Sequence, residues 1–120
     1  MISARGNLRP VVWIGTSNAD VSGLPREVRA SFGVRLYELQ QGGMPSDFKP
    51  LPQFGRGVYE LREAFERNAY RLVYAVNFRK ALYVLHVFMK TSKTGIGLPR
   101  PDIDLITTRL RRAHDLDSED

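Results

Sequence analysis

The chain has 120 residues, 42% of them hydrophobic and 26% charged, with no cysteine and with 18 lysine and arginine residues against 13 acidic ones. This length and composition predict one globular domain over residues 1–120, because two hydrophobic cores rarely fit in so short a chain. The absence of cysteine excludes disulfide frameworks, zinc ribbons, iron–sulfur clusters and cysteine nucleophiles.

The sequence also limits metal sites and membrane association. No apolar segment approaches the ~20 residues that cross a bilayer, and the first residues do not lead into the hydrophobic region of a signal peptide. We therefore expect a cytoplasmic protein without a membrane partner. The only histidines are His86 and His114, and the carboxylates lack the spacing of a magnesium site. We expect no metal and no other cofactor.

The positive charge is concentrated in the first 114 residues. Four of the 13 acidic residues lie within the last six positions, which leaves 18 basic against 9 acidic residues, or +9, in residues 1–114. Fourteen of the basic residues are arginine, which favours bidentate contacts with phosphate. This pattern predicts a polyanionic partner such as nucleic acid. A basic surface that serves only solubility is the alternative.

The first half of the chain predicts a strand, a helix and a loop. Residues 11–14 form a short apolar segment between Pro10 and Gly15, which is typical of a strand. Helical spacing of apolar residues predicts an amphipathic helix over residues 22–41, with Ser22 as its N-cap and Gly42 and Gly43 after its end. Residues 42–57 contain seven glycines and prolines and predict a loop.

The second half predicts a three-stranded meander followed by a helix. Segments 58–65, 69–77 and 81–89 have strand-like composition, and their short connections require antiparallel hairpins. Residues 90–101 predict a loop. Ile103, Ile106, Leu110 and Ala113 then recur at helical spacing, and residues 115–120 predict an acidic, frayed tail. The order indicates an α+β fold: a small antiparallel sheet of the N-terminal strand and the meander, with helices packed on one face.

Alternation along the second meander strand places Arg71 on the face opposite Tyr70, Leu72, Tyr74 and Val76. The apolar set suits the helices, so we expect Arg71 on the exposed face. Basic residues near the strand ends would complete a phosphate-binding surface, and two tyrosines would stack on bases. These residues are Arg62, Arg67, Lys90 and Lys93, with Tyr59 and Tyr83. The alternative is a cross-strand ion pair between Arg71 and Glu63 or Glu66.

The familiar catalytic motifs are missing from the sequence. It contains no Gly-x-x-x-x-Gly-Lys phosphate loop, no Gly-x-Ser-x-Gly elbow and no His-Glu-x-x-His. Any catalysis must therefore use arginine, lysine, histidine or tyrosine. RNA cleavage meets this condition, because the substrate supplies its own 2′-hydroxyl nucleophile. His86 is one candidate, and a hydrogen-bonded core histidine is the alternative for that residue.

Several segments together resemble the RelE/HigB-type toxins of bacterial toxin–antitoxin systems, in particular the phage-related HigB-like branch. The segments follow the family's order at about its spacing, and the resemblance covers roughly residues 10–113. They are Leu51-Pro52, Gly57-Val58-Tyr59-Glu60-Leu61-Arg62, Tyr70-Arg71-Leu72-Val73-Tyr74, Leu85-His86-Val87-Phe88-Met89-Lys90 and Lys93-Thr94.

The resemblance implies a RelE-like fold and a type II toxin that acts as a ribosome-dependent, metal-independent mRNA endonuclease. Such a toxin inhibits translation and growth, and a cognate antitoxin with a helix-turn-helix DNA-binding domain restrains it. The other partners implied are the ribosome and mRNA.

The resemblance also assigns roles to individual residues. Arg71 would contact the scissile phosphate, and Arg62 lies near a position where many members have a basic residue. His86, Lys90 and Lys93 are all eligible as general acid or base, because residues 102–116 lack the tyrosine that some members use.

Two other functions fit the same sequence. ParE-type toxins share this fold and inhibit DNA gyrase without cutting RNA, and a plain basic nucleic-acid-binding module needs no catalysis. Arg71 and the pair Lys90 and Lys93 favour RNA cleavage.

Overall fold

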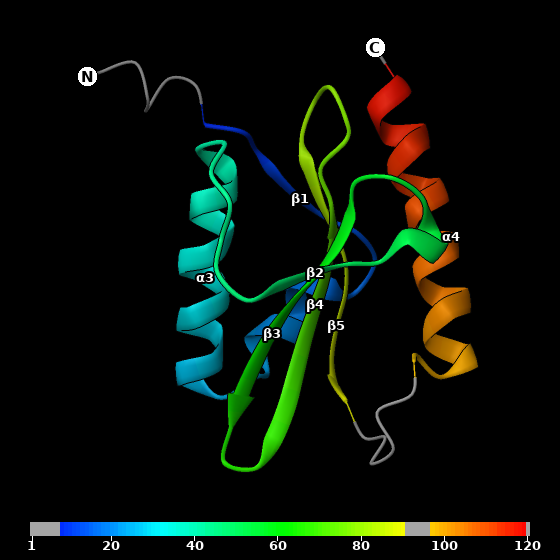
Figure 1. The fold of residues 1–120 in the computed structure, drawn as a ribbon. Helices are drawn as coiled ribbons and strands as arrows, with labels where there is room; N and C mark the ends of the chain where they lie inside the picture. Colours follow the sequence, from blue (N-terminus) through cyan, green and yellow to red (C-terminus); the bar gives the residue numbers. More distant parts are fainter. Residues whose placement is uncertain (1–7, 91–96, 120) are drawn as a thin grey trace.

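The computed structural model describes residues 8–90 and 97–119. Its five strands form one sheet in the order β1-β5-β4-β3-β2, with helix α3 on one face and α4 on the other (Figure 1). The elements in chain order are β1 (Val11–Trp13), α2 (Ser17–Ser22), α3 (Arg26–Gln40), β2 (Phe48–Pro50), the 3-10 helix η1 (Pro52–Phe54), β3 (Val58–Phe65), β4 (Asn68–Ala75), β5 (Leu82–Lys90) and α4 (Arg100–Ser118).

The predicted α+β class is confirmed, but two details of the predicted sheet are wrong. The sheet is mixed, because β1 pairs with β5 in parallel, and it gains β2 at the opposite edge. The helices cover both faces, not one. Strand β5 explains this arrangement, because its nearly continuous apolar sequence exposes hydrophobic side chains on both sides of the sheet and requires cover on both.

Each helix completes a separate hydrophobic core. On one side, Phe32 and Leu36 of α3 belong to a core that includes Leu72 and Tyr74 of β4. On the other side, residues of α4 pack with the opposite face of the same strands. This second core contains Ile106 and Ala113 with Val73, Ala75 and Leu85. The alternation predicted for β4 is therefore correct, and the face that carries Arg71 is the α4 side. The expected exposure of that face is wrong, because α4 packs on it and the Arg71 side chain is only 13% exposed.

The predicted helix over residues 22–41 corresponds to α3, which begins later than predicted and is preceded by a separate short helix, α2. Helix α2 ends at Ser22, and α3 begins at Arg26 with Pro25 as its N-cap. Pro25 disfavours a helical conformation at the preceding residue, which breaks the helix there, so Ser22 is not an N-cap. The predicted end is correct, because Gly42 follows the C-cap with φ of 87°, a conformation that glycine adopts without strain. The predicted loop over residues 42–57 contains β2 and η1.

The predicted meander is confirmed almost residue for residue. Strand β3 has the predicted bounds, and a two-residue turn, Glu66-Arg67, joins it to β4. Both turn residues have positive φ values, 48° and 69°, as the twist of a tight hairpin requires. Arg67 therefore lies at the exposed hairpin tip.

One extra residue interrupts the pairing of β5 with β4. Val73 pairs with His86 and Tyr74 pairs with Val84, so Leu85 is a β-bulge. The guanidinium of Arg109 in α4 donates a 2.9 Å hydrogen bond to the Leu85 carbonyl oxygen. The bulge thus supplies an attachment point for α4.

The predicted fraying of the acidic tail is wrong for its first part, because α4 continues to Ser118. The Asp117 carboxylate accepts hydrogen bonds from the backbone N–H groups of Arg79 (2.9 Å) and Lys80 (2.8 Å) and from the Tyr83 hydroxyl (3.1 Å). These contacts attach the end of α4 to the connection between β4 and β5. Over the described residues, no helix is long and apolar enough to cross a membrane.

We predict that Asp117→Ala lowers the melting temperature by a few degrees, because it leaves three donors without their acceptor. Asp115→Ala, two residues earlier and exposed, is the control for loss of an acidic side chain. Desolvation acts to raise the pKa of Asp117, but the hydrogen bonds from Arg79, Lys80 and Tyr83 lower it overall. The stabilisation of the fold by the Asp117 carboxylate is therefore present above the usual aspartate pKa and is lost as pH falls below it. Thermal unfolding followed by circular dichroism checks this; equal melting temperatures for both variants would contradict the anchoring role.

Candidate functional site

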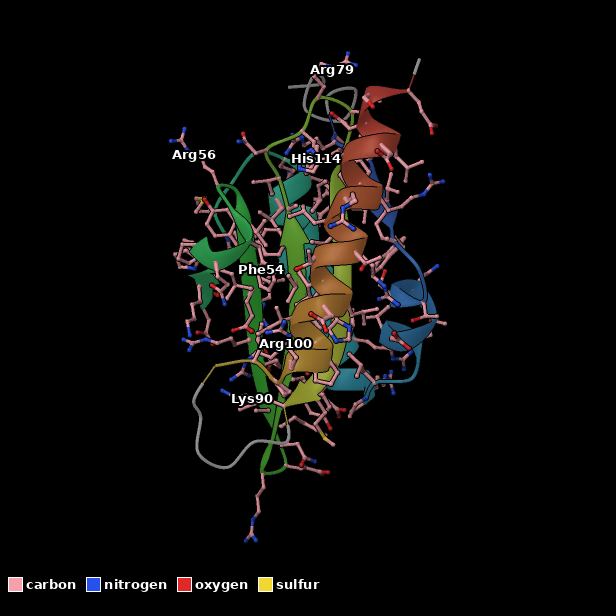
Figure 2. The ribbon with its side chains drawn as sticks, turned by 90° about the vertical axis from the view of Figure 1, so that its right-hand side faces the viewer. Phe54, Arg56, Arg79, Lys90, Arg100 and His114 are labelled. Carbon is pink, nitrogen blue, oxygen red and sulfur yellow. The ribbon has the colours of Figure 1, made fainter. Side chains whose placement is uncertain are left out.

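Charged side chains gather on the α4 side of the sheet, near the start of α4. Cross-strand register places Lys49 of β2 opposite Glu60 of β3, and Arg62 of β3 opposite Arg71 of β4. Lys90 of β5 lies opposite Ala69, two residues before Arg71 on β4. We call Lys49, Glu60, Arg62, Arg71 and Lys90 the Arg71 cluster. Figure 2 shows this face with α4 in front, and Lys90 lies at its lower end beside the start of α4.

The centre of the Arg71 cluster is a buried ion pair. Arg71 Nε lies 3.4 Å from Glu60 Oε1, and the two side chains are only 13% and 6% exposed. Arg71 Nη1 also donates to the carbonyl oxygen of Tyr70. Arg71 therefore forms a cross-strand ion pair, as the alternative interpretation held, but its partner is Glu60 and not Glu63 or Glu66. Glu63 lies on the α3 side, where it accepts hydrogen bonds from Ser31 and Arg35.

Burial raises the pKa of Glu60, although Arg71, Lys49, Lys90 and Arg62 act in the opposite direction. The raised pKa means that the cost of desolvating the carboxylate outweighs the attraction of its four cationic neighbours. The sequence analysis did not name Glu60 as a site residue. The pattern that could have identified it is its position two residues before Arg62, which puts both side chains on the face of Arg71.

An open hollow of about 220 Å³ lies beside Arg71. Ala64 and Ala69 pair across β3 and β4 and line this hollow, because their methyl groups leave the space above the strands unfilled. Arg62 also lines it and forms an exposed 2.9 Å ion pair with Asp47. Asp47 and Glu63 also line the hollow. A small anion placed there would meet two guanidinium groups, each of which is already paired with a carboxylate.

His86 connects the sheet to the first turn of α4. Its Nε2 atom lies 2.7 Å from Asp102 Oδ1, its ring stacks on Phe88 with centroids 4.5 Å apart, and it is 7% exposed. Nδ1 is buried and has no hydrogen-bond partner among the described residues. This geometry matches the hydrogen-bonded core histidine considered for this position, and it positions α4 beside the Arg71 cluster.

The remaining candidates that the structure describes are not gathered at the Arg71 cluster. Arg67 lies at the hairpin tip, and Lys93 lies outside the described residues. The two tyrosines do not present rings beside Arg71, contrary to expectation. Tyr59 packs on the α3 side against Phe48 and Tyr74.

Tyr83 is 2% exposed in the core under α4. Burial, together with its hydrogen bond to Asp117, raises the pKa of Tyr83 to about 12. Its ring is therefore part of the core and is inaccessible to a base.

The Arg71 cluster combines the components of general acid–base chemistry at a phosphate. Guanidinium groups can bind phosphate oxygens and offset charge that develops on them. A buried carboxylate with a raised pKa is more basic than an exposed one, which suits it to accept a proton. Across residues 8–90 and 97–119, no three histidine, aspartate or glutamate side chains stand together as a metal-binding group.

Comparison with known proteins connects this site to one family. The family model described as phage-derived protein Gp49-like (DUF891) matches residues 19–111, which include β2 to β5, most of α4 and the whole Arg71 cluster. No curated protein sequence and no solved structure matches the chain.

We predict that Glu60→Gln changes how stability depends on pH. Because the pKa of Glu60 is raised above 4.5, the folded protein holds this proton more tightly than the unfolded chain does. The free energy of unfolding therefore falls as pH rises from the usual glutamate pKa through the folded one. Glu60→Gln removes this loss, so the variant gains stability relative to the wild type when a pH below the usual glutamate pKa is compared with a pH well above it.

Urea unfolding at both pH values measures the difference. Glu66→Gln, at the exposed hairpin tip, is the control for loss of one carboxylate. A Glu60→Gln stability difference that stays constant with pH would contradict the buried-charge interpretation.

Proposed function

The chain belongs to the phage-derived Gp49-like family, a toxin-like family, and from this premise we propose that it is a type II toxin that cleaves mRNA on the ribosome. The observation that carries the proposal is the Arg71–Glu60 pair, with Arg71 beside an open hollow that Arg62 also lines. The resemblance of the surrounding segments to RelE/HigB-type toxins supports the same function. In this proposal the partners of the protein are the ribosome, mRNA and a cognate antitoxin with a helix-turn-helix domain, and the protein acts in the cytoplasm.

In the proposed reaction, Arg71 holds the scissile phosphate in the hollow, and Arg62 contributes a second guanidinium. The 2′-hydroxyl of the preceding ribose attacks phosphorus and transfers its proton to the Glu60 carboxylate. The bond from phosphorus to the 5′ oxygen breaks, and that oxygen takes a proton from Lys90. The products are a 2′,3′-cyclic phosphate and a 5′-hydroxyl end. Each residue acts on a different atom, so the cluster needs no metal in this scheme.

His86 has a positioning role in this scheme. Its Nε2 atom is engaged by Asp102, which leaves Lys90 as the proton donor favoured among the described residues. The contact holds the first turn of α4 next to the cluster. Lys93, which lies outside the described residues, stays eligible as a further cation.

We predict that Arg71→Ala reduces cleavage of ribosome-bound mRNA by roughly 10²–10³-fold, the loss typical of removing one group that stabilises transition-state charge. Arg71→Lys should recover only part of the activity, because an ammonium cannot form the bidentate contact. Arg26→Ala, which removes an exposed arginine at the start of α3, is the matched control. Primer extension on mRNA after in vitro translation measures the cleavage.

Three outcomes would contradict all or part of this proposal. Wild-type cleavage by Arg71→Ala would remove Arg71 from the reaction. Growth inhibition with intact transcripts would favour a gyrase-directed toxin, and steeply salt-dependent RNA binding without cleavage or toxicity would favour a plain binding module.

We predict that Glu60→Gln lowers the single-turnover cleavage rate by roughly 10²–10⁴-fold while mRNA binding stays close to wild type, because the amide cannot accept the 2′-hydroxyl proton. The pH–rate profile should also lose its acidic limb, which in the wild type reports protonation of Glu60. Lys49→Ala is the control, because Lys49 pairs with Glu60 across the strands. This variant removes a charge beside Glu60 but keeps the Glu60 carboxylate. An unchanged acidic limb in Glu60→Gln would assign the base to another residue.

A further inference from the structure

A second hollow lies on the α4 side, at the end of the sheet away from Lys90. Its volume is about 180 Å³, and three segments enclose it: the turn after η1, the connection after β4, and the second half of α4. Figure 2 shows Phe54, Arg56 and His114 around this region, above Lys90 and Arg100. The lining side chains are Phe54, Val58, Asn77, Phe78, Leu110 and His114, with Arg56 also contributing. We call this hollow the aromatic pocket.

The rings of the aromatic pocket are held in place before any ligand binds. Phe78 packs edge to face on His114, with centroids 4.7 Å apart, and on Tyr83, with centroids 4.9 Å apart. The backbone of α4 near His114 is fixed because Asp117, one turn later, binds the backbone of Arg79 and Lys80. The pocket therefore offers aromatic surfaces to a flat ligand at little cost in conformational entropy.

The glycine at position 57 allows the chain to pass close to Asn77 at the pocket. Gly57 has φ of 84°, and a Cβ at this position would lie 2.6 Å from Asn77 Cβ, which is too close for any other residue without movement. The carbonyl oxygen of Gly57 also accepts a hydrogen bond from the N–H of Val76. Asn77 lines the pocket and is exposed, so its amide, with one acceptor and two donor hydrogens, is available to a ligand.

The size and chemistry of the aromatic pocket fit a single-ring heterocycle. A cavity of about 150 Å³ holds one benzene ring, so the pocket accommodates a six-membered ring but not a larger drug-sized molecule. The aromatic side chains supply stacking surfaces, and Asn77 can pair with the polar edge of a base. Arg56 is exposed and positively charged, which suits a phosphate attached to the ligand.

The aromatic pocket and the Arg71 cluster share strand β3. Val58 lines the pocket, Glu60 belongs to the cluster, and Arg62 lies beyond it, all on the same face of the sheet. Alternate residues on one face are roughly 6.6 Å apart along a strand, so the pocket lies roughly 13 Å from the row of Arg62 and Arg71. A short single strand of RNA can span this distance.

We propose that the aromatic pocket binds a pyrimidine base of the single-stranded RNA whose backbone is cut at the Arg71 cluster. The inference rests on the proposed function for the choice of RNA, and it adds a subsite that reads one base near the cleavage point. The base stacks against Phe54, Phe78 and His114, Asn77 pairs with its polar edge, and Arg56 binds its phosphate.

The test is an NMR titration of the full chain with nucleoside 5′-monophosphates. CMP and UMP should shift the amide signals of Gly57, Asn77 and Phe78, whereas AMP and GMP should bind more weakly. Phe54→Leu and His114→Gln should each weaken CMP binding by roughly 5- to 100-fold, the range expected for losing one stacking surface. Arg112→Ala, on another face of α4, and Arg26→Ala are the matched controls and should bind CMP as the wild type does.

Several results would overturn the inference. These are shifts reproduced by inorganic phosphate alone, tighter binding of purine than of pyrimidine nucleotides, and unchanged CMP affinity in both ring variants. Unchanged proton spectra in the absence of ligand would show that the variants are folded, and Arg56→Ala, at an exposed position, gives an independent variant that should weaken CMP but not cytidine.

Cleavage mapping separates this inference from the proposed function. If the subsite is correct, Phe54→Leu changes which positions in an mRNA are cut, while Arg71→Ala reduces cleavage at every position without changing CMP binding. Pocket-dependent CMP binding by a wild-type protein that cuts no RNA would refute the nuclease and leave the pocket standing. Cleavage that depends on Arg71 but keeps its positions in Phe54→Leu would refute the subsite and leave the nuclease standing.

Discussion

The β-bulge at Leu85 is the constraint on which the candidate site depends. Strict alternation from Tyr83 would place His86, Phe88 and Lys90 on the α3 side, whereas the extra residue turns all three toward α4 and Arg71. The bulge also leaves the Leu85 carbonyl oxygen available to Arg109, and it lets His86 reach Asp102. One inserted residue thus sets both the composition of the charged face and the attachment of α4 to it.

Helix α4 connects the two proposed binding regions. Its first turn is held by His86, its middle by the Leu85 carbonyl oxygen, and its end by the contacts of Asp117. Its apolar residues Ile106 and Ala113 fill the core between these points. The helix is therefore fixed along its length. Its first turn lies next to the Arg71 cluster and its second half carries His114 at the aromatic pocket, so the distance between the two regions is fixed.

The Arg71 cluster illustrates a conflict between stability and chemistry. Burial of a carboxylate is unfavourable, and the raised pKa of Glu60 shows that four nearby cations do not compensate for it fully. Replacing the charged pair with apolar residues would suit a core that had only to be stable. A buried carboxylate beside a guanidinium does, however, suit the phosphate chemistry that we propose, and the cores under α3 and α4 provide the stability that tolerates it.

The sequence by itself determined the α+β class, the bounds of β3, and the face on which Arg71 lies, because these follow from local turn residues and two-residue alternation. Tertiary structure decided the rest. The parallel pairing of β1, the cover on both faces and the bulge at Leu85 depend on contacts between residues distant in the chain, which no local pattern encodes. For the same reason Glu60 emerged as the partner of Arg71, while Tyr59 and Tyr83 proved to be packed in the two cores: whether a polar side chain is buried or free is settled by what folds over it.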